Sequence, residues 1–200
     1  PTHIEVSKKM ITNSEELPGA LLQVVDKDGN VVEEWISTDK PHEIVAKLVV
    51  DESYVLREVR PADGWAYAED VPFKVSHDGT IDHVKMEDKP THVVISKQEI
   101  TGSEELPGCT LQVIDKNGNV VDEWVSTDQP HEIKEKLIAD EEYTLREVRP
   151  ADGWAYAEDI QFKVSHDGTV DQVKMEDKPT HVVVSKKIIT GKEEDRKSVV

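Results

Sequence analysis

The sequence predicts an all-β protein built from two tandem β-sandwich domains. Short runs rich in Val, Ile, Thr and Tyr alternate between apolar and polar residues, which is the period of a half-buried strand. Turn residues separate these runs, and no long stretch keeps the 3.6-residue period of a helix. Nearly the whole pattern occurs twice. Short strands without helices, repeated once, are typical of two small sandwiches.

The repeat sets the expected domain limits. Lys8 and Lys97 are equivalent positions, and at their offset of 89 residues (97 − 8) about three quarters of the aligned letters match. This period is too long for the common solenoid repeats and fits a small all-β domain. We therefore expect one domain at residues 1–90 and a second at residues 91–179.

Residues 180–200 begin a third copy of the repeat and then diverge from it. "THVVVSKKIITG" follows the pattern, but "KEEDRKSVV" replaces the expected "SEELPG". We interpret this segment as a remnant, a capping strand or an artificial end of the chain. Lys186 takes the place that Lys8 has in the first copy, and we expect its amine to stay free.

Seven strands are expected in the first repeat, where apolar and polar residues alternate. They are His3–Lys8, Ala20–Val25, Val31–Ser37, His42–Lys47, Ser53–Val59, Val71–Ser76 and His83–Asp88. The turns "DKDGN" (Asp26–Asn30) and "SHDGT" (Ser76–Thr80) each predict a hairpin, because Asp, Asn and Gly tolerate positive φ. "DKDGN" also has some letters of a calcium loop, but it lacks the full set of ligands and the terminal Glu, so the turn is favoured.

The connection between the repeats is short. Only "KPTHVVIS" separates Asp88 from Lys97, with no spacer rich in Gly or Ser. Because flexible tethers have a different composition, we expect the last strand of one domain to run almost directly into the first strand of the next. This organisation predicts an elongated rod with limited bending.

Charge and hydropathy exclude several classes of partner. The net charge is −18 and no basic stripe is visible, which argues against nucleic acid. We interpret the acidity as a solvated surface, with cation binding as the less favoured alternative. The apolar runs are too short to span a bilayer, and the first residues lack the regions of a signal peptide. We therefore expect no membrane contact, a mature or excised segment, and a monomer.

The single cysteine, Cys109, stands where the first repeat has Ala20. One thiol cannot make a disulfide framework within the chain. Leu111 and Val113 share its strand parity, so an inert buried thiol is favoured over a reactive or dimer-forming one.

Three ionisable residues in each repeat are predicted to point inward. Residues two apart share a face of a strand, and each of the three ends a series of apolar residues on its face. They are Lys8, Glu58 and Asp88 in the first repeat, and Lys97, Glu147 and Asp177 in the second. Burying an isolated charge costs several kcal/mol, so they are tolerable if they meet in one cluster. The alternative is that each ends its strand with a solvated head or a simple salt bridge.

A buried lysine beside two carboxyls can react. Burial favours the neutral amine and the neutral acid, so the lysine becomes a nucleophile and the aspartic acid an electrophile that loses water. The glutamate would shuttle the proton and stabilise the tetrahedral intermediate. The product is an amide between side chains, and holding the groups side by side gives a high effective molarity.

The first repeat has four motifs in order: "VSK" with Lys8, "LPGA" before the second strand, "EVRPADGW" with Glu58, and "HVKMED" with Asp88. Together they resemble the Cna B-type (SpaA-type, prealbumin-like) repeat domains of Gram-positive surface adhesins and pilins, which have an Ig-like sandwich. Val59 departs from the usual Thr. Asp88 replaces the commoner Asn, so water and not ammonia would be released.

The resemblance implies isopeptide bonds from Lys8 to Asp88 and from Lys97 to Asp177, with Glu58 and Glu147 catalytic. It implies a stalk repeat of a bacterial cell-surface adhesin or pilus-like protein, extracellular and anchored to the cell wall through other regions. Neighbouring repeats of the same chain are the expected partners. A host glycan or matrix protein would be reached through other domains.

Two other classes of function remain as alternatives. A module that itself binds a host glycan or matrix protein would use the tryptophans. They are Trp35, Trp65, Trp124 and Trp154. Packing in the core or rim is favoured for these rings, although strand parity places Trp35 and Trp124 outward. A turnover enzyme is the least favoured class, because the eight histidines lack metal-ligand spacing and no nucleophile elbow is found. We expect no cofactor and no metal.

Overall fold

The computed structural model describes residues 3–77, 80–187 and 194–198. The first repeat has β1 (His3–Met10), β2 (Leu21–Val25), β3 (Val31–Ile36), β4 (His42–Glu43), β5 (Ser53–Arg60), β6 (Val71–Lys74) and β7 (Ile81–Asp88). The second has β8 (His92–Glu99), β9 (Thr110–Ile114), β10 (Val120–Val125), β11 (His131–Lys134), β12 (Glu142–Arg149), β13 (Ile160–Lys163) and β14 (Val170–Asp177). β15 (Val183–Lys187) and β16 (Glu194–Ser198) follow.

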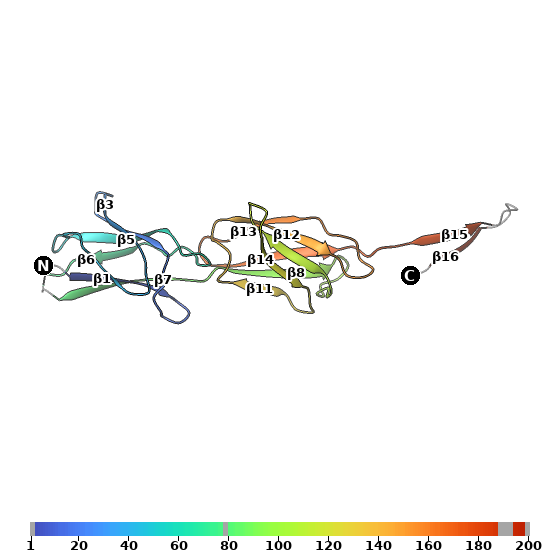
Figure 1. Ribbon diagram of the computed structural model, residues 1–200, viewed down its shortest axis with the longest axis horizontal. Helices are drawn as coiled ribbons and strands as arrows, with labels where there is room; N and C mark the ends of the chain where they lie inside the picture. Colours follow the sequence, from blue (N-terminus) through green and yellow to red (C-terminus); the bar gives the residue numbers. More distant parts are fainter. Residues whose placement is uncertain (1–2, 78–79, 188–193, 199–200) are drawn as a thin grey trace. The chain divides into compact units, whose positions relative to one another are not determined.

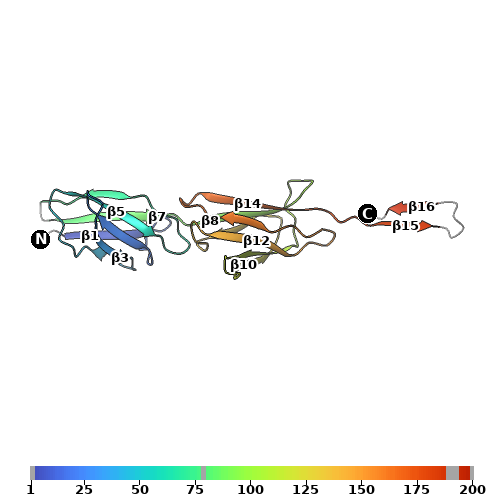
Figure 2. The same cartoon turned by 90° about the horizontal axis from the view of Figure 1, so that it is seen from above.

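Each repeat is a two-sheet sandwich, as predicted (Figures 1 and 2). In the first repeat one sheet has the order β4-β1-β7 and the other the order β3-β2-β5-β6. The second repeat has the equivalent sheets β11-β8-β14 and β10-β9-β12-β13. β1 and β7 pair in parallel, with Lys8 opposite Met86 and Met10 opposite Asp88. The first and last strands of the first repeat are therefore direct neighbours.

Both sheets contribute to the core of the first repeat. Its buried members are Ile4, Val6, Ala20, Leu22, Val24, Ile44, Leu48, Tyr54, Leu56, Val75, Val84 and Met86. On β1, β5 and β7 they occupy every second position, since alternate side chains point to one face. In the second repeat the equivalent strands bury Val93, Ile95, Leu111, Val113, Leu145, Val173 and Met175. The alternation that predicted the strands is thus the one that forms the cores.

The fourth strand is shorter than the predicted His42–Lys47. β4 ends at Glu43, and the next segment makes different hydrogen bonds. The Glu33 carboxylate accepts hydrogen bonds from the backbone N–H groups of Val45 and Ala46, at 2.9 and 2.7 Å. A side chain of β3 therefore satisfies donors that a longer strand would have used.

The two predicted turns behave differently. "DKDGN" is a hairpin turn: Asp26 N–H donates to the Asn30 carbonyl at 3.0 Å, and Gly29 has a φ of +85°. The Asp26 carboxylate accepts hydrogen bonds from the Asn30 side chain and from the backbone N–H groups of Asn30 and Asp28, and these hydrogen bonds lower its pKa. The turn interpretation is confirmed.

The hairpin predicted at "SHDGT" is wrong. In the second repeat, where all of this segment is described, it joins β13 and β14, which belong to different sheets. The Asp171 side chain accepts hydrogen bonds from both the backbone N–H and the hydroxyl of Ser165. The segment is therefore a crossover between sheets that a side chain closes, whereas a hairpin would pair its flanking strands. Part of the first copy, residues 78–79, lies outside the described residues.

Two connections complete the chain. β7 ends at Asp88 and β8 begins at His92, so the direct connection between the repeats is confirmed. β15 and β16 form a separate antiparallel pair in which Lys186 lies opposite Asp195, and the Lys186 side chain is exposed.

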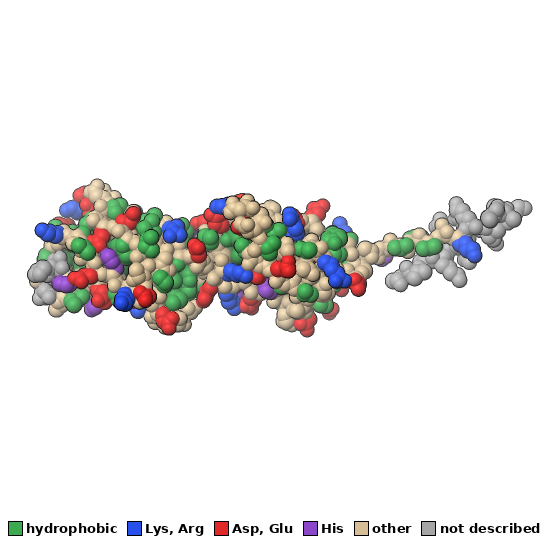
Figure 3. All heavy atoms as spheres, in the orientation of Figure 1, with side chains coloured by type: hydrophobic (Ala, Val, Ile, Leu, Met, Phe, Trp, Pro, Cys, Tyr) green, Lys and Arg blue, Asp and Glu red, His purple; other side chains and the backbone are tan. Residues whose placement is uncertain are grey.

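The surface carries mixed charge. In the face that Figure 3 shows, acidic and basic side chains are interspersed over both repeats, as a solvated acidic surface predicts. Among the described residues, no helix has the length and apolar character needed to cross a membrane.

Candidate functional site

Lys8 reaches the core because β1 keeps its alternation to that residue. It follows Ile4 and Val6 on the inner face, and only 1% of the residue is exposed. Its backbone is held on both sides: the N–H donates to Glu16 Oε2 at 3.1 Å, and the carbonyl accepts from Leu17 N–H at 2.7 Å. The strand therefore delivers a long basic side chain into a dry interior.

The "LPGA" segment is fastened to the sheet by Ser37. The Ser37 hydroxyl donates to the Leu17 carbonyl at 2.7 Å and accepts from Ala20 N–H at 2.9 Å. Gly19 turns the chain between them with a φ of +99°, a conformation that favours glycine. This fixes the start of β2 and buries Ala20 completely.

Glu58 points inward from β5. Its Oε2 accepts a hydrogen bond from Ala68 N–H at 2.7 Å, and its Oε1 lies 2.7 Å from Lys8 Nζ. Although Oε1 is within ion-pair distance, no well-directed hydrogen bond reaches it. The carboxyl is thus oriented by a backbone amide on one side and faces the lysine on the other.

A β-bulge explains why Val59 leaves the site undisturbed. Leu22 pairs with Glu58, whereas Leu21 pairs with Arg60, so Val59 is the extra residue of β5. Its side chain is 40% exposed. The departure from the usual Thr therefore lies on the outer side, away from the Glu58 carboxyl.

Asp88 ends β7 beside Lys8. The side chain is fully buried, Oδ1 contacts Lys8 Nζ, and Oδ2 has no hydrogen-bond partner. Burial raises the pKa of Asp88 to about 7, with the Glu58 charge adding to the rise and Lys8 opposing it. Because the Asp88 carboxyl keeps its proton up to neutral pH, the cluster of one ammonium, one carboxylate and one neutral carboxyl has no net charge.

The second repeat builds the same cluster. Lys97 Nζ contacts Asp177 Oδ1 and lies 2.9 Å from Glu147 Oε1. Glu147 Oε2 accepts from Ala157 N–H at 2.8 Å, as Glu58 does from Ala68. Burial again raises the pKa of the aspartate, against the effect of Lys97. Both predicted clusters are therefore present, and the solvated-head alternative is wrong, because all three side chains are buried in each repeat.

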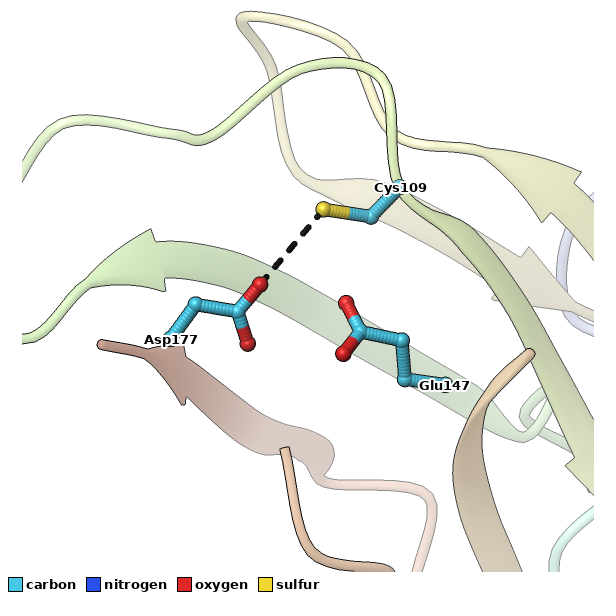
Figure 4. A group of neighbouring side chains, drawn as sticks. All are labelled: Cys109, Glu147 and Asp177. Carbon is cyan, nitrogen blue, oxygen red and sulfur yellow. Dashed lines mark hydrogen bonds between the residues drawn. The ribbon is translucent and has the colours of Figure 1, made fainter. Parts of the chain in front are cut away.

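One contact distinguishes the two clusters. Cys109 Sγ lies 3.7 Å from Asp177 Oδ2, as the dashed line in Figure 4 marks. The thiol is buried as predicted, and burial raises its pKa. Sequence reasoning placed Cys109 in the core but gave no signal that it would meet the aspartate, because the two residues lie 68 positions apart.

Cys109, Glu147 and Asp177 together carry atoms that can bind a metal ion. Figure 4 shows Cys109, Glu147 and Asp177 converging, and their ligand atoms lie within 4.8 Å of one another. However, Lys97 already brings a cation to both carboxyls, and the raised pKa of the thiol opposes the thiolate that a metal needs. The donor set therefore suits a lysine better than a metal ion.

The tryptophans pack within their repeats. Trp35 contacts the core cluster, and its ring stacks on His42 at a centroid distance of 4.3 Å. The outward placement of Trp35 is wrong, because it lies opposite Leu22, whose side chain is in the core, while Ile36 faces solvent. A register shift makes Val32 an extra residue of β3, so simple alternation along this strand does not predict its inner face.

Of the other three rings, Trp65 is buried, Trp154 is half-buried, and Trp124 is half-buried and stacks on His131 at 4.1 Å. The expected packing in the core or rim is confirmed for these positions, and the outward lean of Trp124 is wrong. Among the histidines, His3, His83 and His181 are exposed, whereas His92 is half-buried.

Comparisons with known proteins agree with this fold. Residues 2–90 and 91–179 each match the family model described as SpaA, prealbumin-like fold domain. A comparison with curated proteins finds no match. Among solved structures, the Bacillus anthracis TIE protein has a TM-score of 0.50 at 17% identity, over 90% of this chain and 34% of that chain. This chain thus spans about a third of that protein's length.

Two further structures come from Lactobacillus rhamnosus GG. The C-terminal fragment of the pilus adhesin SpaC has a TM-score of 0.47 at 13% identity, and the shaft pilin SpaA has a TM-score of 0.42 at 12% identity. Each match covers 90% of this chain and 98% of the other protein's chain.

Proposed function

Because the chain belongs to the family of SpaA prealbumin-like fold domains, we propose that it is a stalk segment of a bacterial cell-surface adhesin or pilus-like protein. In this proposal a Lys–Asp isopeptide bond locks each domain. The segment is extracellular on a Gram-positive cell, anchored through regions outside this sequence. Its main partners are neighbouring repeats, and its chemistry is a single intramolecular step without turnover. SpaA from Lactobacillus rhamnosus GG is described as a shaft pilin, and the matched family carries the same name.

The observation that carries the proposal is the contact between a buried lysine and a buried aspartic acid in each repeat. Lys8 Nζ touches the Asp88 carboxyl and Lys97 Nζ touches the Asp177 carboxyl, with a glutamate beside each pair. A buried ion pair contributes little to stability after desolvation. Forming an amide removes both charges from the core. The amide therefore stabilises the folded domain more than the ion pair does.

The reaction follows from the positions of the atoms. Glu58 Oε1 takes a proton from Lys8, and the neutral amine attacks Cγ of the protonated Asp88. A C–N bond forms, the proton held by Glu58 passes to the hydroxyl, and the C–O bond breaks to release water. The nitrogen then gives its remaining extra proton to Glu58, so the product is a neutral amide beside a protonated glutamic acid. Ala68 N–H keeps the Glu58 carboxyl aimed at the amine, which is the contribution of a positioned proton shuttle. Glu147 acts in the same way on Lys97 and Asp177.

The tryptophans favour the structural role over a ligand-binding module. Trp35 and Trp65 are used in packing within the first repeat. A glycan-binding site would instead need an open aromatic face.

The mass of the denatured chain tests the proposed bonds. It is expected to fall short of the sequence mass by two waters, one for each repeat. Glu58→Ala should restore one water, and Glu147→Ala the other, because each glutamate serves only its own lysine. Intact mass spectrometry under denaturing conditions makes the measurement.

Peptide mapping supplies the control. The cross-links should join Lys8 to Asp88 and Lys97 to Asp177, while Lys186 stays a free amine on an exposed strand. A full sequence mass for the wild-type chain, or a cross-link at Lys186, would contradict the proposed function.

A further inference from the structure

The two reacting aspartates differ in one hydrogen-bond partner. Asp177 Oδ2 accepts a hydrogen bond from the Cys109 thiol, with an S···O distance of 3.7 Å. The equivalent Oδ2 of Asp88 is buried and has no partner, because Ala20 occupies the position of Cys109. A buried carboxyl oxygen without a donor is unusual. The thiol therefore supplies the hydrogen-bond donor that the equivalent aspartate oxygen of the first repeat lacks.

The backbone around this position is the same in both repeats. Cys109 N–H donates to the Ser126 hydroxyl at 2.9 Å, and the Cys109 carbonyl accepts from Ser126 N–H at 2.8 Å. Ala20 makes the same two contacts with Ser37, at 2.9 and 2.8 Å. The sulfur atom is thus the main change at this point, and the two repeats form a natural matched pair.

The thiol has the protonation state of a donor. Burial raises the pKa of Cys109, so the S–H group persists at neutral pH and above. An S–H donor is weaker than N–H or O–H, but in a dry site a donor aimed at a developing charge is more effective than in water.

We propose that Cys109 donates a hydrogen bond to the Asp177 oxygen that becomes negative when Lys97 attacks, and so accelerates bond formation in the second repeat. This inference rests on the proposed function. The C–N bond forms between Lys97 Nζ and Asp177 Cγ, the C–O bond to the leaving hydroxyl breaks, and water departs with the proton first carried by Glu147. The nitrogen gives its remaining extra proton to Glu147, which ends protonated beside a neutral amide. The thiol keeps its proton and its electrons, and stabilises only the tetrahedral oxyanion.

The expected effect is modest. Removing one strong donor from an oxyanion site costs about 10²- to 10³-fold in rate. Because the S–H donor is weaker, we expect loss of the thiol to slow the reaction by about tenfold, and by no less than threefold.

The Gly108–Cys109 junction allows a direct test. Residues 1–108 and 109–200 can be joined in denaturant by ligation at Cys109, which gives the full chain with a second repeat that has never folded. Desulfurisation of half the product converts Cys109, the chain's single cysteine, into alanine. Both chains are refolded together, and the loss of water from the second repeat is followed by mass spectrometry and peptide mapping.

The wild-type chain is expected to form the Lys97–Asp177 bond at least threefold faster than the desulfurised chain. Equal rates, or a faster alanine chain, would overturn the inference and leave the proposed function standing. If neither chain loses water, both fail. A cross-link that hydroxylamine cleaves would mean a thioester at Cys109, and would also overturn the role of the thiol as a donor.

Two variants separate hydrogen bonding from packing. Cys109→Ser keeps a donor and loses little volume, so its rate should stay well above that of alanine. It can be made by ligation at a temporary cysteine in place of Ala155, which desulfurisation then restores. Ala20→Cys, in a chemically synthesised chain, should accelerate the first repeat. A purely structural role for the sulfur predicts altered unfolding with unchanged bond-formation rates in both variants, and that pattern would refute the proposal.

Discussion

Asp88 shows how burial changes the chemistry of an ordinary side chain. In water its carboxyl would be ionised at neutral pH. In the core its pKa rises to about 7, chiefly because burial penalises the charged form. The reactive arrangement of the cluster has two protons shared among Lys8, Glu58 and Asp88, and so carries no net charge. That arrangement is favoured below the raised pKa and lost above it.

The pH dependence of bond formation in the first repeat follows from this shift. The pKa is raised, so the protonated acid, which holds the leaving hydroxyl, persists from pH 3.8 up to about 7. We expect a nearly constant rate below pH 7 and a fall of about tenfold per pH unit above it. A chemically synthesised chain that has not folded before can be refolded between pH 5 and 9 and its water loss timed.

The opposite profile would contradict this assignment. A rate that climbs steadily to pH 9 would mean that the supply of neutral Lys8 amine limits the reaction, with an aspartate that needs no proton. Folding itself, followed by tryptophan fluorescence at each pH, is the control, because slow folding would mask the chemical step.

Among the strands, β4 is short because the Glu33 side chain supplies the hydrogen bonds that strand pairing would otherwise make after it. Its carboxylate accepts two backbone N–H groups and contacts His42 Nε2 at 2.7 Å. The second repeat places Asp122 beside His131 at the same distance. In the first repeat the Glu33 carboxylate also holds the backbone of the segment that follows the short β4.

Glu33→Ala should therefore destabilise the first repeat by about 2 kcal/mol, because it leaves two backbone donors without their acceptor. The measurement is urea unfolding in a Glu58→Ala, Glu147→Ala background, which lacks the proposed bonds. Glu34→Ala is the matched control: it removes an exposed side chain that contacts Gln23, and it should cost less than about 0.5 kcal/mol. Equal losses for the two variants would mean that the Glu33 contacts add nothing.

At the scale of the whole molecule, the proposed bonds determine how each domain carries force. Lys8 and Asp88 lie 80 positions apart, on the neighbouring first and last strands. A bond between them would pass tension directly from β1 to β7. By the chain-entropy argument used for disulfides, closing a loop of this length adds about 4.5 kcal/mol if strain is small. A domain of this size is otherwise only marginally stable.

Wild-type domains are therefore expected to resist heat and trypsin, and to show no stepwise extension under single-molecule pulling. In the Glu58→Ala, Glu147→Ala variant each repeat should unfold at ordinary forces and release roughly 250 Å of chain. If the two proteins extend alike, the proposed stalk function loses its mechanical basis, and a ligand-binding role becomes the better explanation.

The fold class, most of the strands and the inward direction of the reactive residues could be predicted from the sequence. These features follow from alternation along single strands, which is a local property: Ile4, Val6 and Lys8 share a face whatever lies opposite them. Because buried charges must meet, the same local rule also predicted the cluster of Lys8, Glu58 and Asp88.

Tertiary structure decided which distant segments meet. The crossover at Ser165–Thr169 depends on which sheet β14 joins, and the end of β4 depends on the Glu33 carboxylate. The amide of Ala68 that orients Glu58 and the thiol that reaches Asp177 also come from other parts of the chain. Such contacts join a side chain to a backbone or a carboxyl far away in sequence, so no local period records them, and only the packed sandwich brings them together.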